Sequence, residues 1–446
     1  MRHRSSLRGT ASRIGALCLI LASASPARAD HDDADRDRHN GNGNNGPLSL
    51  VTTVPIPPTK HNATNGNLYS FDISWVDHLR QRYYLADRSN AVIDVLDAKS
   101  ATFIGSIDAG FAGVAVVNGA VNNGQSGPNG VVTGGHCLFA TDSPSRVVSF
   151  DLNASFPPPI VSSVNTAAGD PFRADELAYA AGPGILLVIN NADNPPFGTL
   201  IAVNKRTCAL TVGKQISFTA ATNGAEQPQW NPSDNLFYLS IPSISGTTAS
   251  PGPTGAVYRI DPTSGRFDTA ATIDNCGPAG LTIGPNGDLL VGCNTTYDVK
   301  GNVWDPTKNV TAAPRNIILR TKTGKVDKVV FGAGAGDEVW FNPGDNNYYV
   351  TGSGSPYRPL PAATSQGSTP LGVISATEEK LIQLVPTFNV PAVGTGNSAT
   401  QHPAGTAHSV AANAKNNLVF VPLAANNAFP NCVQGCVSVF GREEQE

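Results

Sequence analysis

The sequence is short of charge, of methionine and of long apolar runs, and each shortage excludes a class of protein. Charged residues are 14% of the 446 residues, with 30 Lys and Arg against 34 Asp and Glu. This low, slightly acidic charge excludes a coiled coil and a basic nucleic-acid binder, so no nucleic-acid partner is expected. A single Met argues against a helix-rich core of Leu and Met. No apolar run reaches the roughly 18 residues that cross a bilayer, so no membrane span is expected.

Glycine and proline are abundant instead. The 45 Gly and 34 Pro residues follow no G-X-Y period, which excludes collagen. Spread through a chain rich in Val, Ile, Tyr and Phe, they indicate many short strands joined by many turns. The composition therefore favours an all-β fold.

The first residues are typical of an export signal. Residues 1–29 combine basic residues such as Arg2 and Arg4 with a short apolar run and a small-x-small site, Ala27-Arg28-Ala29. We expect cleavage after Ala29 and a secreted or periplasmic protein. Residues 30–47 are polar and are predicted to be a disordered linker. Residues 48–446 are predicted to form a single β-propeller domain.

One pattern recurs along this domain: an apolar strand, a turn of Pro, Asn, Gly or Asp, and a second apolar or aromatic strand. Its seven copies occupy residues 73–87, 130–143, 177–190, 228–240, 280–292, 339–352 and 409–423. A third β-rich run follows them, at residues 91–97, 146–152, 199–204, 256–261, 316–321, 371–375 and 436–441. A fourth often comes next, as at 102–107. Seven units of four strands predict an all-β, seven-bladed β-propeller.

The last unit is one strand short. It reaches only its third strand, at 436–441, before the final residues REEQE. The strand-like segment 48–57 precedes the first unit and has no other place. Because an open ring would leave an exposed sheet edge, we expect this N-terminal strand to complete the last blade and close the propeller.

Two segments resemble known propeller repeats. Residues 83–107, YYLADRSNAVIDVLDAKSATFIGSI, resemble the YVTN-type bacterial β-propeller repeat, and residues 277–292, GPAGLTIGPNGDLLVG, are similar to blades of gluconolactonase-like propellers. The resemblance covers nearly all of residues 48–441 and implies the propeller fold. Gluconolactonase-like proteins hydrolyse lactones at a central divalent metal, but they have six blades. With seven repeats here, no metal ligand is carried over from them.

Six cysteines follow the signal segment, and an even number in an exported protein indicates disulfides. Cys276 and Cys293 flank one predicted hairpin and are expected to pair. Cys432 and Cys436 are expected to close a small loop before the last strand. The pairing of the remaining two, Cys137 and Cys208, is left open.

Polar residues recur at the start of the innermost strands, and equivalent positions of a propeller converge on its axis. One level contains Asp72, Asp175, Glu226 and Asp337, with Asn129 near it, and the next contains Glu176, Gln227, Glu338 and His408. Converging carboxylates raise one another's pKa or require a cation. Oxygen ligands suit Ca²⁺ or Mg²⁺, and an imidazole admits Zn²⁺.

Roles follow from this placement. The predicted ligands of a divalent cation are Asp72, Asp175, Glu226, Asp337 and Glu338. Glu176 and His408 are predicted general bases, and Asn129 and Gln227 are expected to line the ligand channel. The competing interpretation is structural, with these groups capping strands, binding channel water or pairing with Arg173.

Two functions remain open. The first is an exported propeller that binds a small ligand, a divalent ion or a protein partner at the loop face around its channel mouth, without chemistry. The alternative is a metal-dependent hydrolase or lyase of lactonase-like type. No Gly-rich segment precedes a helix, so no nucleotide cofactor is expected. A monomer is expected.

Overall fold

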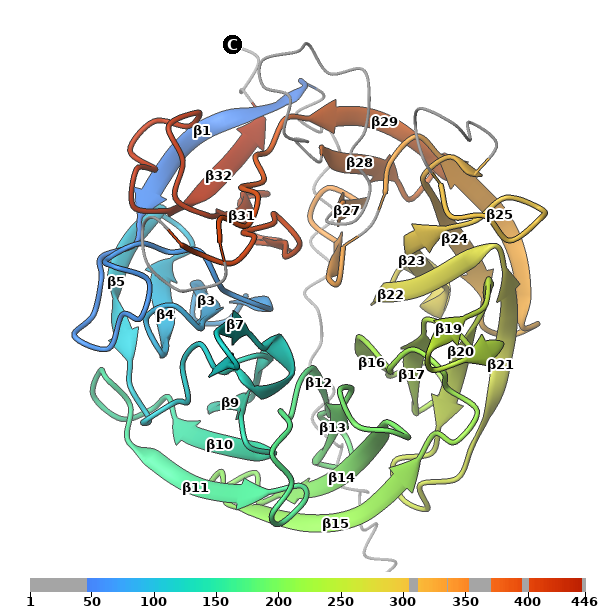
Figure 1. Ribbon diagram of the computed structural model, residues 1–446, viewed down its shortest axis with the longest axis horizontal. Helices are drawn as coiled ribbons and strands as arrows, with labels where there is room; N and C mark the ends of the chain where they lie inside the picture. Colours follow the sequence, from blue (N-terminus) through green and yellow to red (C-terminus); the bar gives the residue numbers. More distant parts are fainter. Residues whose placement is uncertain (1–45, 305–311, 335, 353–369, 395–400, 443–446) are drawn as a thin grey trace, which may run out of the picture. The chain divides into compact units, whose positions relative to one another are not determined.

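The structure is a computed structural model that describes residues 46–304, 312–334, 336–352, 370–394 and 401–442. These residues belong to one compact unit, Asn44–Glu446. Within them the regular elements are strands, apart from two single-turn 3₁₀ helices at Asn123–Gln125 and Pro285–Gly287. The all-β prediction is confirmed, and the strands are organised as four-stranded antiparallel units (Figure 1).

Four sheets each contain four strands that follow one another along the chain. The first contains β2 (Ser74–Asp77), β3 (Arg82–Asp87), β4 (Val92–Asp97) and β5 (Thr102–Ile107). The second contains β8 (Val131–Gly134), β9 (Cys137–Asp142), β10 (Arg146–Asp151) and β11 (Ile160–Asn165). The third contains β12 (Leu177–Ala180), β13 (Ile185–Asn190), β14 (Phe197–Val203) and β15 (Leu210–Ser217). The fourth contains β26 (Val339–Asn342), β27 (Asn347–Thr351), β28 (Leu371–Ser375) and β29 (Lys380–Val385).

A larger sheet combines two such groups. Its first group contains β16 (Pro228–Asn231), β17 (Leu236–Ile241), β20 (Thr254–Ile260) and β21 (Phe267–Asp274). Its second contains β22 (Cys276–Ile283), β23 (Leu289–Thr296), β24 (Arg315–Arg320) and β25 (Lys325–Phe331). One parallel residue pair, Thr254 with Cys276, links β20 to β22. The two groups are antiparallel within themselves.

The two ends of the described chain meet in one sheet. It contains β30 (Ala411–Ala412), β31 (Val419–Leu423), β32 (Cys436–Arg442) and β1 (Leu48–Pro55), with β1 on its edge. β1 pairs antiparallel with β32, from Leu48 opposite Arg442 to Pro55 opposite Cys436. The N-terminal strand therefore lies in the sheet where the sequence analysis placed it.

The first strand of each unit lies nearest the centre of the arrangement (Figure 1). Contacts link these inner strands in the order β2, β8, β12, β16, β22, β26, β30 and back to β2. Small residues permit the close approach. A Cβ at Gly130, one residue before β8, would lie 2.6 Å from the carbonyl oxygen of Asp175, next to β12. Inner strands that contact one another this closely bring the residues preceding them together.

Apolar side chains fill the spaces between neighbouring sheets. One cluster joins the sheet that contains both chain ends to its two neighbours, and includes Val54, Leu85, Tyr349 and Phe420. Another joins β8–β11 to β12–β15 around Phe139 and Val188. Each sheet thus buries both of its faces.

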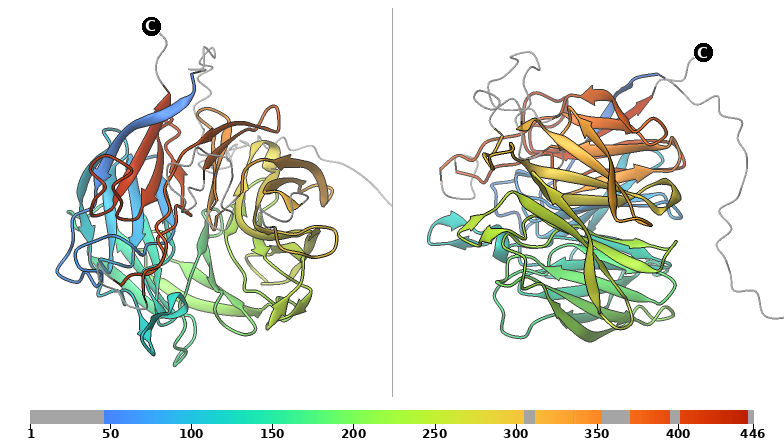
Figure 2. Two further views of the ribbon diagram at one scale, coloured as in Figure 1. Left: turned by 45° about the horizontal axis from the view of Figure 1, so that its top comes forward. Right: turned by 90° about the vertical axis from the view of Figure 1, so that its right-hand side faces the viewer.

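Two short hairpins project on one side of the unit. They are β6 with β7 (Val116–Val117, Ala120–Val121) and β18 with β19 (Gly246–Thr247, Ser250–Pro251). Figure 2 shows both on the face that Figure 1 views. Among the described residues, no helix combines the length and apolarity that a bilayer crossing requires.

Three disulfides are present. Cys276–Cys293 and Cys432–Cys436 form as predicted. The third, Cys137–Cys208, answers the pairing that the sequence left open. It joins β9 to the connection between β14 and β15, and so links two neighbouring sheets.

Candidate functional site

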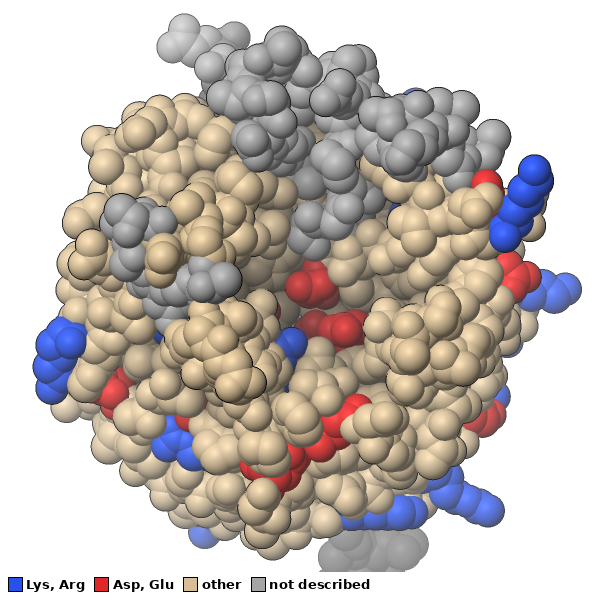
Figure 3. All heavy atoms as spheres, in the orientation of Figure 1, with Lys and Arg blue, Asp and Glu red and all other residues tan. Residues whose placement is uncertain are grey.

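A cluster of carboxyl groups lies at the centre of the unit. Asp72, Asp175, Glu226 and Asp337 each stand one or two residues before an inner strand, and His408 stands shortly before β30. Because the inner strands contact one another, these residues converge, as the repeat alignment predicted. Figure 3 shows acidic side chains and a basic one at the central hollow.

Three of these side chains form the tightest group. One ligand atom from each of Asp72, Asp337 and His408 lies within 4.8 Å of the other two. The His408 Nε2 atom lies 3.4 Å from Asp72 Oδ1. Asn294 Nδ2 donates to Asp337 Oδ1 at 3.2 Å, which orients that carboxylate. We call Asp72, Asp337 and His408 the axial triad.

Thr406 and Phe71 fix the orientation of the His408 ring. Its Nδ1 atom lies 2.7 Å from the carbonyl oxygen of Thr406 and 2.9 Å from the Thr406 hydroxyl. Its ring stacks on Phe71 with 5.2 Å between the centroids. A carbonyl oxygen only accepts, so Nδ1 carries a hydrogen; Nε2 donates to Asp72 when the ring is protonated, and its lone pair faces the triad when the ring is neutral.

Two arginines hold Asp72. Arg88 Nη2 bonds to Asp72 Oδ2, and Arg173 Nη1 lies 3.5 Å from the same oxygen. Burial alone would raise the pKa of Asp72, but Arg88, the hydrogen bond from His408 and Arg173 together lower it to about 2. For His408, burial lowers the pKa, while Asp72 and Asp337 outweigh it and raise it. The Asp72 Oδ1 atom remains directed at His408.

For the other central carboxyls, neighbouring positive charges offset less of the cost of burial. Burial raises the pKa of Asp175 to about 7 despite an ion pair with Arg173 at 2.8 Å. Burial, with the charges of Asp337 and Asp175, raises the pKa of Glu226 to about 8. Burial raises the pKa of Asp337 too, against the opposing charge of His408. An added cation would relieve this electrostatic cost.

Glu176 lies beside them with its carboxyl buried. It is 3% exposed, and burial followed by the charges of Asp175 and Glu226 raises its pKa well above the usual range. No hydrogen bond or ion pair from the described residues reaches its carboxyl oxygens. Its assignment as a general base remains a prediction.

Glu338 and Gln227 connect inner strands instead of facing the triad. Glu338 Oε2 accepts from the N–H groups of Ser74 and Val410 at 3.2 and 3.1 Å, and from Ser409 Oγ at 2.6 Å. Burial raises the pKa of Glu338 to about 8 against these hydrogen bonds. Gln227 Oε1 accepts from Leu281 N at 2.6 Å and Val339 N at 3.4 Å.

Asn129 has a similar linking position. Its Oδ1 accepts from Arg88 Nε at 2.9 Å, and its Nδ2 donates to the Ala174 carbonyl at 2.8 Å. The side chain is fully buried. Asn129 thus positions Arg88 from behind, and the ligand-channel roles of Asn129 and Gln227 remain predictions.

Sequence reasoning missed Arg88, which directly follows β3. The signal was present, because an arginine directly after a strand of buried residues is unusual in a chain with so little charge. Its partner Asp72 follows from the pairing of β2 with β3, since Asp72 precedes β2 and Arg88 follows β3.

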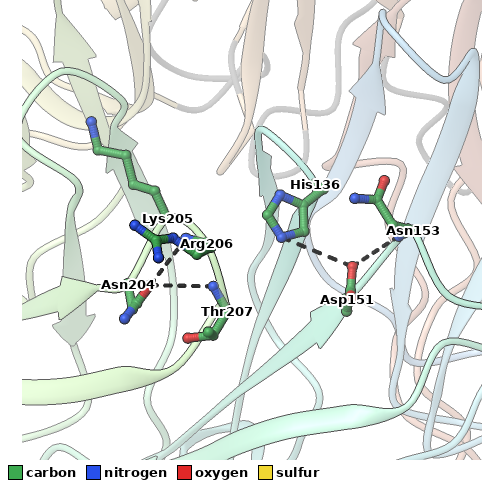
Figure 4. A pocket seen from close by; sticks show the side chains of 7 residues that line it. All are labelled: His136, Asp151, Asn153, Asn204, Lys205, Arg206 and Thr207. Carbon is green, nitrogen blue, oxygen red and sulfur yellow. Dashed lines mark hydrogen bonds and ion pairs between the residues drawn. The ribbon is translucent and has the colours of Figure 1, made fainter.

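A separate surface hollow is lined by His136, Asp151, Asn153, Asn204, Lys205, Arg206 and Thr207 (Figure 4). His136 Nε2 lies 4.0 Å from Asp151 Oδ1. His136 also groups with Cys137 and Cys208, but these sulfur atoms form a disulfide and are not free to bind a metal. The hollow is therefore a weaker candidate than the central cluster.

Comparisons with known proteins concern the fold alone. No family model matches the sequence, and no curated protein matches it. A chain of the hydrazine synthase of Kuenenia stuttgartiensis is similar with a TM-score of 0.57 and 13% identity, over 87% of this chain and 99% of that chain. In all, 1347 solved chains match, so a fold this widely shared does not select a function.

Proposed function

We propose that this protein is a closed seven-bladed β-propeller that binds a divalent cation at the axial triad. The blade count is supported by the single residue pair that joins β20 to β22, which divides the larger sheet into two units of four strands. Closure is supported by the pairing of β1 with β32 and by the circular order of inner-strand contacts.

The observation that carries the proposal is the geometry around His408. Metal-ligating histidines usually donate their second ring N–H to a carbonyl or carboxylate, which fixes the tautomer. His408 has this arrangement with Thr406, and its Nε2 faces two carboxylates within 4.8 Å. Two oxygens and one nitrogen form one face of a coordination sphere and leave room for water or a ligand oxygen.

Charge balance also favours a cation. The central carboxyls outnumber the arginines that face them, the two sets being Asp72, Asp175, Glu176, Glu226 and Asp337 against Arg88 and Arg173. A divalent ion reduces this surplus. An imidazole ligand selects Zn²⁺ or Mn²⁺ over Ca²⁺, which prefers oxygen.

A metal-dependent hydrolase or lyase is the second candidate, and Glu176 is the observation that favours it. A bound divalent ion lowers the pKa of a coordinated water and polarises a carbonyl. Glu176 is a buried carboxyl near the triad without a structural partner, and such a group is available for proton transfer.

Export is proposed with this function. Three disulfides fit an oxidising compartment. The segment 1–29, on which the signal prediction depends, lies outside the described residues.

Metal titration tests the proposal. Protein stripped with EDTA should bind Zn²⁺ or Mn²⁺ saturably in calorimetry, and a hundredfold excess over Kd should stabilise it by about 2.7 kcal/mol. His408→Ala should weaken Zn²⁺ binding by at least about tenfold, because it removes the nitrogen ligand. The same variant should weaken Ca²⁺ binding less than Zn²⁺ binding.

His61→Ala is the matched control, since His61 is exposed and pairs with Asp108 instead. It should leave metal affinity unchanged. Absence of saturable binding to the stripped wild type, or equal affinities of the His408→Ala variant and the wild type, would overturn the proposal.

A further inference from the structure

The Glu176 carboxyl has no hydrogen-bond partner among the described residues, and the sequence of a neighbouring strand explains why. Glu338 and Gln227 stand directly before β26 and β16, and each accepts N–H groups from residues in, or directly before, the next two inner strands around the circle. Glu338 takes those of Val410 and Ser74. Gln227 takes those of Leu281 and Val339.

Glu176 occupies the corresponding place before β12. The next two inner strands are β16 and β22. The first offers Pro228, which has no N–H, and the N–H of Leu281 in the second already belongs to Gln227. A proline at the start of β16 thus leaves Glu176 without the partners that its counterparts have.

Burying a carboxyl without a partner costs free energy. Glu176 is 3% exposed, and Asp175 Oδ1 beside it also has no hydrogen-bond partner among the described residues. Arg173 cannot fully compensate, because its donors are directed to Asp72, Asp175 and Asn191. The vacant acceptor capacity on the β12–β16 side of the channel therefore favours a ligand that donates hydrogen bonds.

The small number of ligating side chains argues against a second metal here. Within the described residues, Glu176 and Glu226 do not join a third ligating side chain at the 4.8 Å separation found in the axial triad. A metal ion needs oxygens at about 2.0–2.6 Å, whereas an ammonium group donates three hydrogens to acceptors about 2.7–2.9 Å away.

The charge balance of the central cluster also favours an ammonium group. If all five carboxyls are ionised, a divalent ion at the triad and the two arginines leave one negative charge; an ammonium group would balance it and would hold Glu176 ionised against the burial that raises its pKa. We propose that Glu176, with the neighbouring half-buried Glu226, binds the ammonium group of a small primary amine. This ammonium site rests on the proposed function for its charge count, and on Pro228 and Glu176 for its geometry.

Calorimetry with n-butylamine, which is charged at neutral pH, tests the ammonium site on the full mature chain, with and without Zn²⁺. Saturable binding is expected, with no binding of 1-butanol. Glu176→Gln should weaken the binding of n-butylamine by at least about tenfold and change the affinity for Zn²⁺ less than twofold. Glu378→Gln, the same change at an exposed site, should alter neither affinity.

Pro228→Ala is the second variant. It restores an N–H to β16 without changing any charge, so Glu176 gains a partner and n-butylamine affinity should fall. Absence of saturable binding to the wild type, equal binding of 1-butanol, or full affinity in Glu176→Gln would overturn the ammonium site. Binding of n-butylamine without any metal binding would overturn the proposed function and leave the ammonium site standing.

Discussion

At the scale of single residues, the positions before the inner strands have two different roles. Glu338 and Gln227 accept backbone N–H groups and hold neighbouring strands in register. Asp72 and His408, which precede the neighbouring inner strands β2 and β30, face each other, and arginines and Thr406 hold them in place. Polar side chains that stand one or two residues before an inner strand therefore differ in function because their neighbours differ in hydrogen-bond donors.

Removing Glu338 should destabilise the fold strongly. Glu338→Ala leaves the buried N–H groups of Ser74 and Val410 without an acceptor, which should cost about 2–4 kcal/mol in urea unfolding. Glu338→Gln keeps an acceptor oxygen and should cost less. Glu378→Ala, at an exposed position, should change stability by less than about 0.5 kcal/mol. Equal stabilities of the Glu338→Ala and Glu378→Ala variants would contradict the linking role.

A second buried carboxyl pair lies away from the axis. Asp87 Oδ1 and Oδ2 accept from Asn90, and Asp94 Oδ1 accepts from Ser106. Asp94 Oδ2 has no hydrogen-bond donor among the described residues, and a proton held between Asp94 and Asp87 would satisfy it. Burial raises the pKa of Asp87 to about 6 and that of Asp94 well above its usual range, where Asp87 adds to the shift.

This pair should make stability depend on pH. Both pKa values are higher in the folded chain than in the unfolded chain, so the proton stabilises the fold. The stabilisation is complete below about pH 4 and is lost as pH rises through about 6 and above. Asp94→Asn keeps a donor toward Asp87 and should flatten this decline. Urea unfolding from pH 4 to 8 measures it, and parallel curves for wild type and variant would exclude the shared proton.

At the scale of elements, the disulfides differ in what they join. Cys276–Cys293 links the neighbouring strands β22 and β23, at a sequence separation of 17. Cys137–Cys208 links two sheets, at a separation of 71. The longer loop constrains the unfolded chain more.

The inter-sheet disulfide should therefore contribute more stability. Replacing Cys137 and Cys208 by Ala should cost about 4 kcal/mol, against about 3 kcal/mol for Cys276 and Cys293. Thermal and urea unfolding of the two double variants would give the ranking. The reverse order would show that strain or packing, and not loop length, controls their contributions.

The elements were largely predictable. Short runs of Val, Ile, Tyr and Phe between Gly, Pro and Asn turns identified strands such as Thr102–Ile107 and Leu371–Ser375 at their observed bounds. The local pairings of Cys276 and Cys432 followed from hairpin and loop geometry. The pairing of Cys137 did not, because it depends on which faces of two sheets pack together.

At the scale of the whole molecule, the repeat pattern predicted that the carboxyls lie close together, since equivalent residues of repeated units approach one centre. Repetition could not show which of them face one another. Arg88 follows β3 and Asp72 precedes β2, and the partners of Glu338 come from β2 and from the segment before β30. These contacts follow from curvature and sheet order, which a linear alignment does not contain.

The pairing of β1 with β32 has a consequence for folding kinetics. The Gly46 carbonyl and the Arg442 guanidinium, 396 residues apart, form a hydrogen bond beside this pair. β1 cannot complete its pairing until β32 has been synthesised, so this sheet assembles only after nearly 400 further residues have been added. Formation of this sheet therefore carries a large loop-closure entropy and should be a late step. Until then, the apolar face of β1, with Leu48 and Val54, is the segment most in need of protection from aggregation.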